Sequence, residues 1–243
     1  MIISYKKVSN NKYKVILDNE ELILYDDIII KYNLLTKKAL DKKELEEVKS
    51  ANDEYFYYDQ TLKFISKKLR SEFEVNKYLL KYNISNKVIN NIIKKLKDNN
   101  IINDVIFTES YVHDKILLSN DGPYKIINDL EKLNVDKDII DNKIKYYAKE
   151  LELDKIKKYV SKNIQANKNK SRELLKQKIL HNLIMQGYTK EYIDDILENF
   201  NIDDKGIYEK EYQKEYNKLS KKYSGNELEY KIKNKMYEKG FRQ

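Results

Sequence analysis

Side chains that could perform acid–base or metal chemistry are few and scattered in this chain. There is no cysteine, and the two histidines, His113 and His181, lie far apart with no second histidine at ligand spacing. Disulfides, thiolate catalysis and cysteine-based zinc sites are therefore excluded. The carboxylates are dispersed as helix charges, and the five isolated glycines form no phosphate-binding loop. We expect no enzyme activity, no bound metal and no cofactor.

Clustered cations offer a second kind of chemistry, the binding of anions. The chain has 48 Lys and Arg against 40 Asp and Glu, giving a net charge of +8 and a pI near 9.1. This balance favours acidic partners such as nucleic acid or an acidic protein surface, although solvated lysine-rich faces are common. Residues 155–178 form the most basic stretch, with nine Lys or Arg and one Glu. The residues that we select as candidates for contacting a partner or DNA are Lys67, Lys68, Arg70, Lys125, Lys168, Lys170, Arg172 and Lys176.

The elements that carry these residues begin with a short β-rich segment. Apolar and polar residues alternate on both sides of a turn dipeptide in residues 1–24, which predicts a hairpin. The alternating residues are Tyr13, Val15 and Leu17, then Leu22 and Leu24 after a turn at Asp18-Asn19. Residues 26–50 resemble two short helices, with Asp41 as a helix N-cap. The chain is helical from about residue 54, and Pro123 marks the start of a helix.

A repeat emerges when the predicted helix breaks are aligned. Each break has Asn or Gly as its second residue, an apolar third residue and, where a fourth is present, a good N-cap. The breaks are Tyr82-Asn83-Ile84-Ser85, Leu133-Asn134-Val135-Asp136, Gln186-Gly187-Tyr188-Thr189 and Lys239-Gly240-Phe241, at offsets of 51, 53 and 53 residues. A period near 50 indicates stacked helical units.

The predicted fold is mainly α: tandem three-helix repeats that form an elongated curved rod behind a β-hairpin-containing head. The head covers residues 1–53, and three-helix repeats cover 54–102, 103–150 and 151–201. Residues 202–243 form a partial fourth repeat without a third helix.

Some of these helix pairs could also act as helix-turn-helix DNA readers, a reading that we weigh below a packing role. The helix after Thr189 is rich in carboxylates and would repel phosphate. Only the helix after Ser85, which carries Lys87, Lys94, Lys95 and Lys97, could contact DNA.

Taken together, ordered motifs over roughly residues 54–243 resemble the RecX family. Leu69-Arg70-Ser71-Glu72, with Glu74 and Leu79, is similar to the start of the second helix in that family's first repeat. Leu96 through Asn103-Asp104 to Phe107 resembles the joint between its first two repeats, and Asp104 is expected to cap the helix there. Further matches are Gly122-Pro123 with Ile126 and Leu130, and the turns Gln186-Gly187-Tyr188 and Lys239-Gly240-Phe241. Asn100-Ile101 and Thr108 depart from the family pattern.

The resemblance implies a regulator of RecA recombinase. Such a protein binds RecA and its filament on single-stranded DNA and inhibits recombinase, ATPase and co-protease activities in recombination, DNA repair and the SOS response. A helical-repeat nucleic-acid-binding protein without a recombinase partner is the alternative. We expect a cytoplasmic monomer, because no apolar run approaches the roughly 18 residues of a membrane span and residues 1–7 do not resemble a signal peptide.

Overall fold

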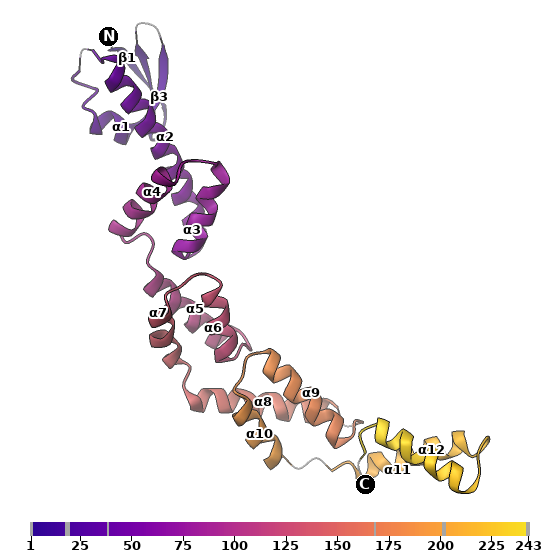
Figure 1. The fold of residues 1–243 in the computed structure, drawn as a ribbon. Helices are drawn as coiled ribbons and strands as arrows, with labels where there is room; N and C mark the ends of the chain where they lie inside the picture. Colours follow the sequence, from indigo (N-terminus) through magenta and orange to yellow (C-terminus); the bar gives the residue numbers. More distant parts are fainter. Residues whose placement is uncertain (1, 18–19, 38, 168, 201–202, 242–243) are drawn as a thin grey trace. The chain divides into compact units, whose positions relative to one another are not determined.

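The computed structural model describes residues 2–17, 20–37, 39–167, 169–200 and 203–241. The chain divides into two compact units, Met1–Phe107 and Thr108–Gln243. Most described residues are helical, and the strands that the structure describes lie near the N-terminus (Figure 1). No helix among the described residues is both long and apolar enough to cross a bilayer.

Unit one begins with a three-stranded antiparallel sheet in the order β1-β2-β3. The strands are β1 (Ile2–Ser9), β2 (Lys12–Leu17) and β3 (Glu21–Tyr25). Tyr13 pairs with Leu24 and Val15 with Leu22, so the predicted hairpin is confirmed and gains a further strand. The expected turn at Asp18-Asn19 lies outside the described residues. Val15 and Leu24 face a core completed by the two helices that follow the sheet.

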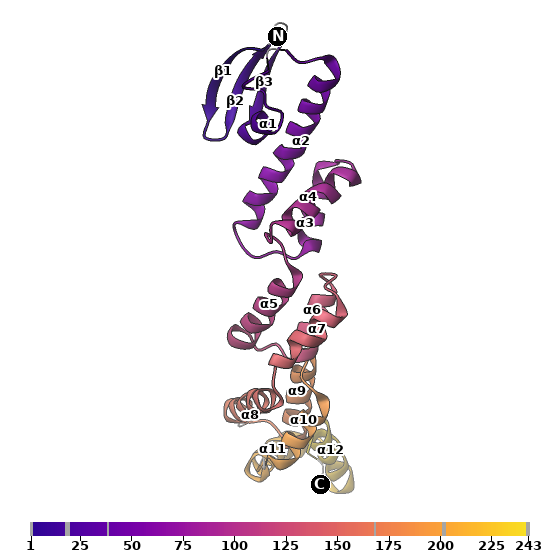
Figure 2. The same cartoon turned by 90° about the vertical axis from the view of Figure 1, so that its left-hand side faces the viewer.

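The first two helices of unit one are α1 (Asp26–Lys31) and α2 (Lys42–Ile65). Asp41 caps α2 as predicted: its carboxylate accepts the Glu44 amide at 2.8 Å, and the Glu44 side chain accepts the Asp41 amide at 3.2 Å. We expected this helix to end near residue 50, but α2 continues to Ile65, alongside the α3–α4 pair (Figure 2). The predicted boundary between residues 53 and 54 falls inside α2, because no glycine or proline interrupts the helix there.

Unit one continues with α3 (Glu72–Leu79), the 3₁₀ turn η1 (Leu80–Tyr82) and α4 (Asn86–Asp98). Val75 and Leu79 of α3 pack with Ile89, Ile92 and Leu96 of α4 and with Tyr58 of α2 in one core. We call the α2–α4 bundle repeat one. The helix α5 (Asp104–Leu118) begins at the end of unit one.

Unit two contains the remaining helices. After α5 come α6 (Pro123–Glu131), α7 (Lys137–Lys143) and the 3₁₀ turn η2 (Ile144–Tyr146), then α8 (Lys149–Ala166), α9 (Arg172–Met185) and α10 (Lys190–Asn199). The last pair is α11 (Lys205–Leu219) and α12 (Gly225–Glu238). We call α5–α7 repeat two, α8–α10 repeat three and the α11–α12 pair repeat four.

Each repeat has its predicted break after its second helix. Asn83 and Asn134 both have φ of 52°, and Gly187 and Gly240 have φ of 80° and 79°. These are left-handed conformations that end a helix, so the four predicted breaks are confirmed. Pro123 is the first residue of α6, also as predicted.

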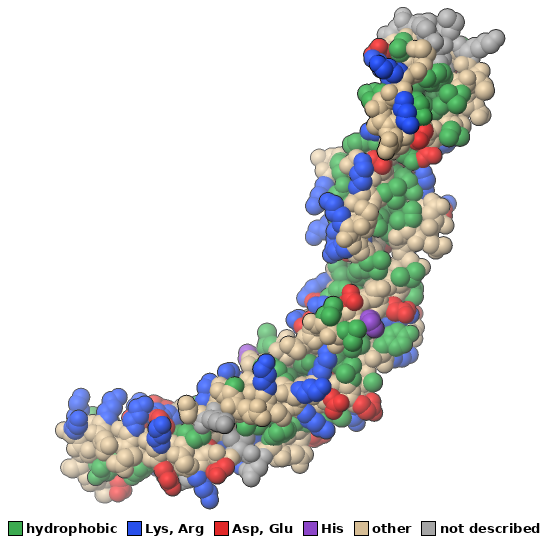
Figure 3. Space-filling view, turned by 180° about the vertical axis from the view of Figure 1, so that it is seen from behind, with side chains coloured by type: hydrophobic (Ala, Val, Ile, Leu, Met, Phe, Trp, Pro, Cys, Tyr) green, Lys and Arg blue, Asp and Glu red, His purple; other side chains and the backbone are tan. Residues whose placement is uncertain are grey.

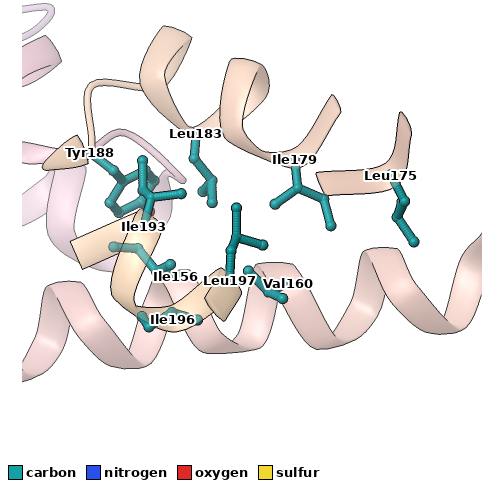
Figure 4. Close-up of a cluster of buried hydrophobic side chains, with 9 residues drawn as sticks. All are labelled: Ile156, Val160, Leu175, Ile179, Leu183, Tyr188, Ile193, Ile196 and Leu197. Atoms are coloured by element: carbon teal, nitrogen blue, oxygen red, sulfur yellow. The ribbon is translucent and has the colours of Figure 1, made fainter. Parts of the chain in front are cut away.

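Repeat three shows how three helices share one core (Figure 4). Ile156 and Val160 of α8 face Leu175, Ile179 and Leu183 of α9, and α10 closes the core with Ile193, Ile196 and Leu197. All of these side chains are buried, with an exposed fraction of at most 6%. The apolar residues recur at three- and four-residue spacing, which places them on one face of each helix.

Candidate partner-binding surface

The first candidate cluster lies where α2 ends and α3 begins. Lys67 and Lys68 are exposed, whereas the Arg70 side chain is 15% exposed. The Arg70 guanidinium lies 4.0 Å from the centre of the Phe64 ring and 3.0 Å from Oε1 of Glu74. Burial alone would raise the pKa of Glu74, but hydrogen bonds from Arg70 and the Ser71 amide outweigh it and lower the pKa. Arg70 therefore connects the end of α2 to α3. Lys68 also pairs with Oε1 of Glu74, at 3.3 Å, so Lys67 is the exposed cation of this cluster for which no ion pair is found among the described residues.

Lys125 lies in a different setting, in the first turn of α6. Its ammonium pairs with Asp121, which also accepts Lys115 at 2.6 Å. Burial alone would raise the pKa of Asp121, but hydrogen bonds from the two lysines outweigh it and lower the pKa. Lys125 is therefore partly neutralised within the protein.

The third group of candidates surrounds the start of α9. Lys170 and Arg172 are exposed, and Lys176 is half-buried one turn later; Lys168 lies outside the described residues. Within the described ranges, no carboxylate lies within ion-pair distance of these three side chains. Lys125 lies beside Gly187, just beyond the other end of α9, and 14 residues of helix span about 20 Å. The structure does not bring Lys125 together with this group.

The start of α9 and the start of α3 are built in the same way. Asp104 accepts the Glu72 amide at 2.8 Å, and Asp204 accepts the Arg172 amide at 2.7 Å. Each carboxylate comes from 32 residues further along the chain and caps the middle helix of the preceding repeat. Sequence reasoning missed both caps.

The role predicted for Asp104 was therefore wrong. It was expected to cap α5, its own helix, but Asn103 performs this function. The Asn103 side chain accepts the amides of Val105 at 2.9 Å and Ile106 at 3.3 Å. Asp104 points to α3 instead, where burial raises its pKa.

Repeats two and three meet at a close backbone contact. The Gly122 amide donates to the Gln186 carbonyl at 2.6 Å, and the Tyr124 amide donates to the Gly187 carbonyl at 3.0 Å. The break after α9 thus lies on the start of α6, where free amide groups favour carbonyl oxygens. At the next joint, the Ser171 hydroxyl donates to the Lys239 carbonyl at 2.6 Å. The start of one middle helix contacts the break of the next repeat in both cases.

Buried and half-buried polar side chains also connect repeats two and three. Lys155 donates to the Ile116 carbonyl at 2.6 Å, and burial lowers its pKa. The Tyr147 hydroxyl donates to the Asp121 carbonyl at 3.2 Å, and Glu152, 4% exposed, accepts the Thr189 amide at 2.7 Å. Each group satisfies a backbone partner, so this cluster holds the joint together.

The two histidines lie on different helices. His113 and His181 are both exposed, on α5 and α9. Among the described residues, no group of three or more His, Asp or Glu side chains could hold a metal ion.

Fold and surface together define a class: a helical-repeat protein that carries exposed cations at its helix junctions, with a small β-sheet head. The chain belongs to the RecX family of regulatory proteins. It is 32% identical over 190 residues to the regulatory protein RecX of Listeria monocytogenes serotype 4a, covering 78% of this chain and 71% of that protein. The RecX protein of Lactococcus lactis is 31% identical over 232 residues, covering 92% and 86%. No family model matches the chain.

Solved structures of the family share the fold. A crystal structure of regulatory protein RecX matches with a TM-score of 0.72 at 22% identity and covers 82% of this chain and 98% of that chain. The crystal structure of RecX from Lactobacillus salivarius matches with a TM-score of 0.57 at 30% identity and covers 61% and 96%. These likenesses agree with the tandem helical repeats.

Proposed function

We propose that this chain binds RecA recombinase and its filament on single-stranded DNA, and that it inhibits the recombinase, ATPase and co-protease activities of RecA. Its role would lie in recombination, DNA repair and the SOS response. Membership of a family of regulatory proteins over most of the chain carries this proposal.

The exposed cations at the helix junctions supply the contacts in this proposal. A RecA–DNA filament presents phosphates and acidic side chains, and the exposed cations Lys67, Lys170 and Arg172 can meet them. Lys68 is exposed as well, although its ammonium lies 3.3 Å from Oε1 of Glu74. Lys168 and Lys176 extend the second group in sequence. Contacts from several repeats add avidity, so no single contact needs to be strong. Arg70 and Lys125 contribute indirectly, because they hold their junctions together through Glu74 and Asp121.

The direct test is the ATPase activity of RecA filaments. Purified protein, added below the RecA concentration, should slow DNA-dependent ATP hydrolysis and sediment with the filaments. Unchanged hydrolysis together with no co-sedimentation, even at an excess of this protein, would refute the proposal.

Charge reversal tests the residues. We would test two double variants. One carries Lys67→Glu and Lys68→Glu, and the other carries Lys170→Glu and Arg172→Glu. The structure argues against reversing Arg70, because its side chain is only 15% exposed and its ion pair with Glu74 helps to hold the start of α3. Lys68 also pairs with Glu74, but its side chain is 60% exposed, so we expect its reversal to cost little stability.

The matched control for these variants is Lys221→Glu with Lys222→Glu, an exposed consecutive pair that follows α11. Each test variant should weaken filament binding, with the salt dependence of log affinity flattened by about 0.7–0.9 per lost phosphate contact. Helical content should stay unchanged. If all three variants bound filaments equally well at low salt, we would conclude that these cations do not contact the filament.

One observation favours a second candidate, a nucleic-acid-binding repeat protein that needs no recombinase. The helix α4 carries four lysines and one aspartate. Binding to DNA in the absence of RecA, with no effect of RecA on the affinity, would favour this candidate over the first.

A further inference from the structure

The third helix of a repeat does not have a constant charge. The helix α4 has a net charge of +3, α7 is neutral and α10 has a net charge of −3. The charged residues are Lys87, Lys94, Lys95, Lys97 and Asp98 in α4, Lys137, Asp138, Asp141 and Lys143 in α7, and Lys190, Glu191, Asp194, Asp195 and Glu198 in α10. All three helices follow the break of their repeat and lie third in it. Since α7 and α10 do this without excess lysine, the fold does not require the positive charge of α4.

The lysines of α4 without an ion-pair partner among the described residues lie on its outward face. Lys87, Asn90, Asn91 and Lys94 are exposed, while the opposite face of α4 is buried against α2 and α3. Among the described residues, no carboxylate lies within ion-pair distance of Lys87 or Lys94. These two lysines are seven residues apart, or about 10 Å along the helix axis.

The other two lysines of α4 are already engaged. The Lys97 ammonium lies 2.7 Å from Oε2 of Glu72, and Lys95 lies 4.0 Å from the centre of the Tyr58 ring. The distinction matters, because an engaged lysine serves the fold and an unengaged one is available to a ligand. Lys87 and Lys94 remain as the available pair.

A groove adjoins this face within unit one. It lies between α1, α2 and α4, and its α4 wall includes Lys87, Asn91 and Lys95. Lys31 of α1 lines the groove as well, and Asn91 donates to Glu54 at 3.2 Å across it. In the space-filling view, Lys and Arg side chains gather along one edge of the helical part of unit one (Figure 3). The groove also contains four carboxylates, those of Asp27, Glu46, Glu47 and Glu54, so its charge is balanced. A strand of a polyanion would therefore meet unpaired cations along the outward face of α4 and not inside the groove.

We propose that the outward face of α4 binds the phosphate backbone of nucleic acid directly, without a recombinase. Lysine and asparagine side chains are common donors to phosphate oxygens. The spacing of Lys87 and Lys94 corresponds to about three nucleotide steps, at 3.4 Å per step along one strand. The helix α10, with its net charge of −3, would repel the same ligand, so α4 is the third helix that is suited to hold it. This inference rests on the second candidate function and names its binding face, and it does not require the proposed RecA regulation.

The test uses fluorescence anisotropy with the full chain and no recombinase. One arm uses a labelled oligothymidylate, a second arm a labelled duplex and a third arm a labelled polyglutamate peptide. The test variant is Lys87→Glu with Lys94→Glu. The matched control is Lys137→Glu with Lys145→Glu, two exposed lysines near α7 that bring the same change in net charge.

The wild type should bind at least one of the two nucleic acids. The test variant should bind that nucleic acid about tenfold more weakly, with the salt dependence of log affinity flattened by about 1.4–1.8, as the loss of two phosphate contacts requires. The control should change the affinity by no more than about twofold. The arm with the larger effect identifies single-stranded or duplex nucleic acid as the ligand.

Several results would overturn the inference. One is no binding of either nucleic acid by the wild type, and another is equal loss in the test variant and the control. A loss confined to polyglutamate would assign the face to an acidic protein segment instead. Circular dichroism and the urea midpoint of each variant check that the exposed substitutions leave the fold intact.

Discussion

Gly187 is the position where we expect one added methyl group to have the largest effect. Its φ is +80°, and a Cβ atom at this residue would lie 2.6 Å from Cβ of Lys125 and closer still to the Lys125 amide nitrogen. That nitrogen belongs to the backbone of α6, so no side-chain rotation can relieve the overlap. Gly187→Ala must therefore push the break after α9 away from α6.

The magnitude follows from two contributions to the free energy of unfolding. A left-handed conformation costs a residue with Cβ about 1–2 kcal/mol. Moving the break also lengthens the hydrogen bonds from Gly122 to Gln186 and from Tyr124 to Gly187. Each such bond contributes about 0.5–1.5 kcal/mol. We expect Gly187→Ala to destabilise unit two by about 2–5 kcal/mol, the range that these contributions give together.

Two other glycines separate these contributions. Gly225 has φ of +55° with no atom near the added Cβ, so Gly225→Ala should cost only the conformational part, about 1–2 kcal/mol. Gly206 lies in α11 with open space around it, and Gly206→Ala should stabilise by about 0.5–1 kcal/mol. Urea unfolding followed by circular dichroism measures all three. If Gly187→Ala cost no more than Gly225→Ala, the close contact between α6 and α9 would contribute nothing to stability, and our reasoning would be refuted.

Three further predictions concern pH, caps and chemistry. The pKa of Asp121 is lower in the folded protein than in the unfolded chain, where it is near 4, so the Asp121 carboxylate stabilises the fold above that pH. This contribution is lost as the pH falls through the folded pKa. The difference in unfolding free energy between wild type and Asp121→Asn should therefore shrink between about pH 6 and pH 3, as measured by urea titration. Asp104→Ala and Asn103→Ala should each cost about 1 kcal/mol, because each removes a helix cap; a negligible change in either urea midpoint would contradict the assigned cap. The purified protein should show no metal-dependent nuclease, phosphatase or ATPase activity, and a measurable turnover abolished by His113→Ala or His181→Ala would show that it is an enzyme.

Much of the fold could be predicted from the sequence because its boundaries depend on local chemistry. Asn83 and Gly187 tolerate positive φ, Pro123 suits the first turn of a helix, and Asp41 caps the helix that follows it. Each of these is decided by a residue and its near neighbours. The length of α2 was missed for a related reason, because a change in apolar pattern near residue 54 is not a helix break.

The candidate surface was less accessible to sequence reasoning, because a count of cations does not show which are paired. Arg70 and Lys67 are equivalent as positive charges, yet one lies between Phe64 and Glu74 and the other is free. Asp104 was assigned to its own helix because the amide that it accepts lies 32 residues away. Only tertiary structure brings such partners together.

The caps donated by Asp104 and Asp204 make the repeats depend on one another for folding. The first amide of α3 and of α9 is capped only when the first residues of the following repeat are present and in place. The stability of each of these repeats therefore includes a coupling to the next repeat. Fragments cut just before these aspartates would leave the start of α3 or α9 with an unsatisfied amide, and fragments that include them would not. Two neighbouring repeats should therefore unfold together as one cooperative unit. When the carboxylate of Asp104 or Asp204 is removed by substitution, the cooperative unit should become smaller, so that the two repeats unfold separately.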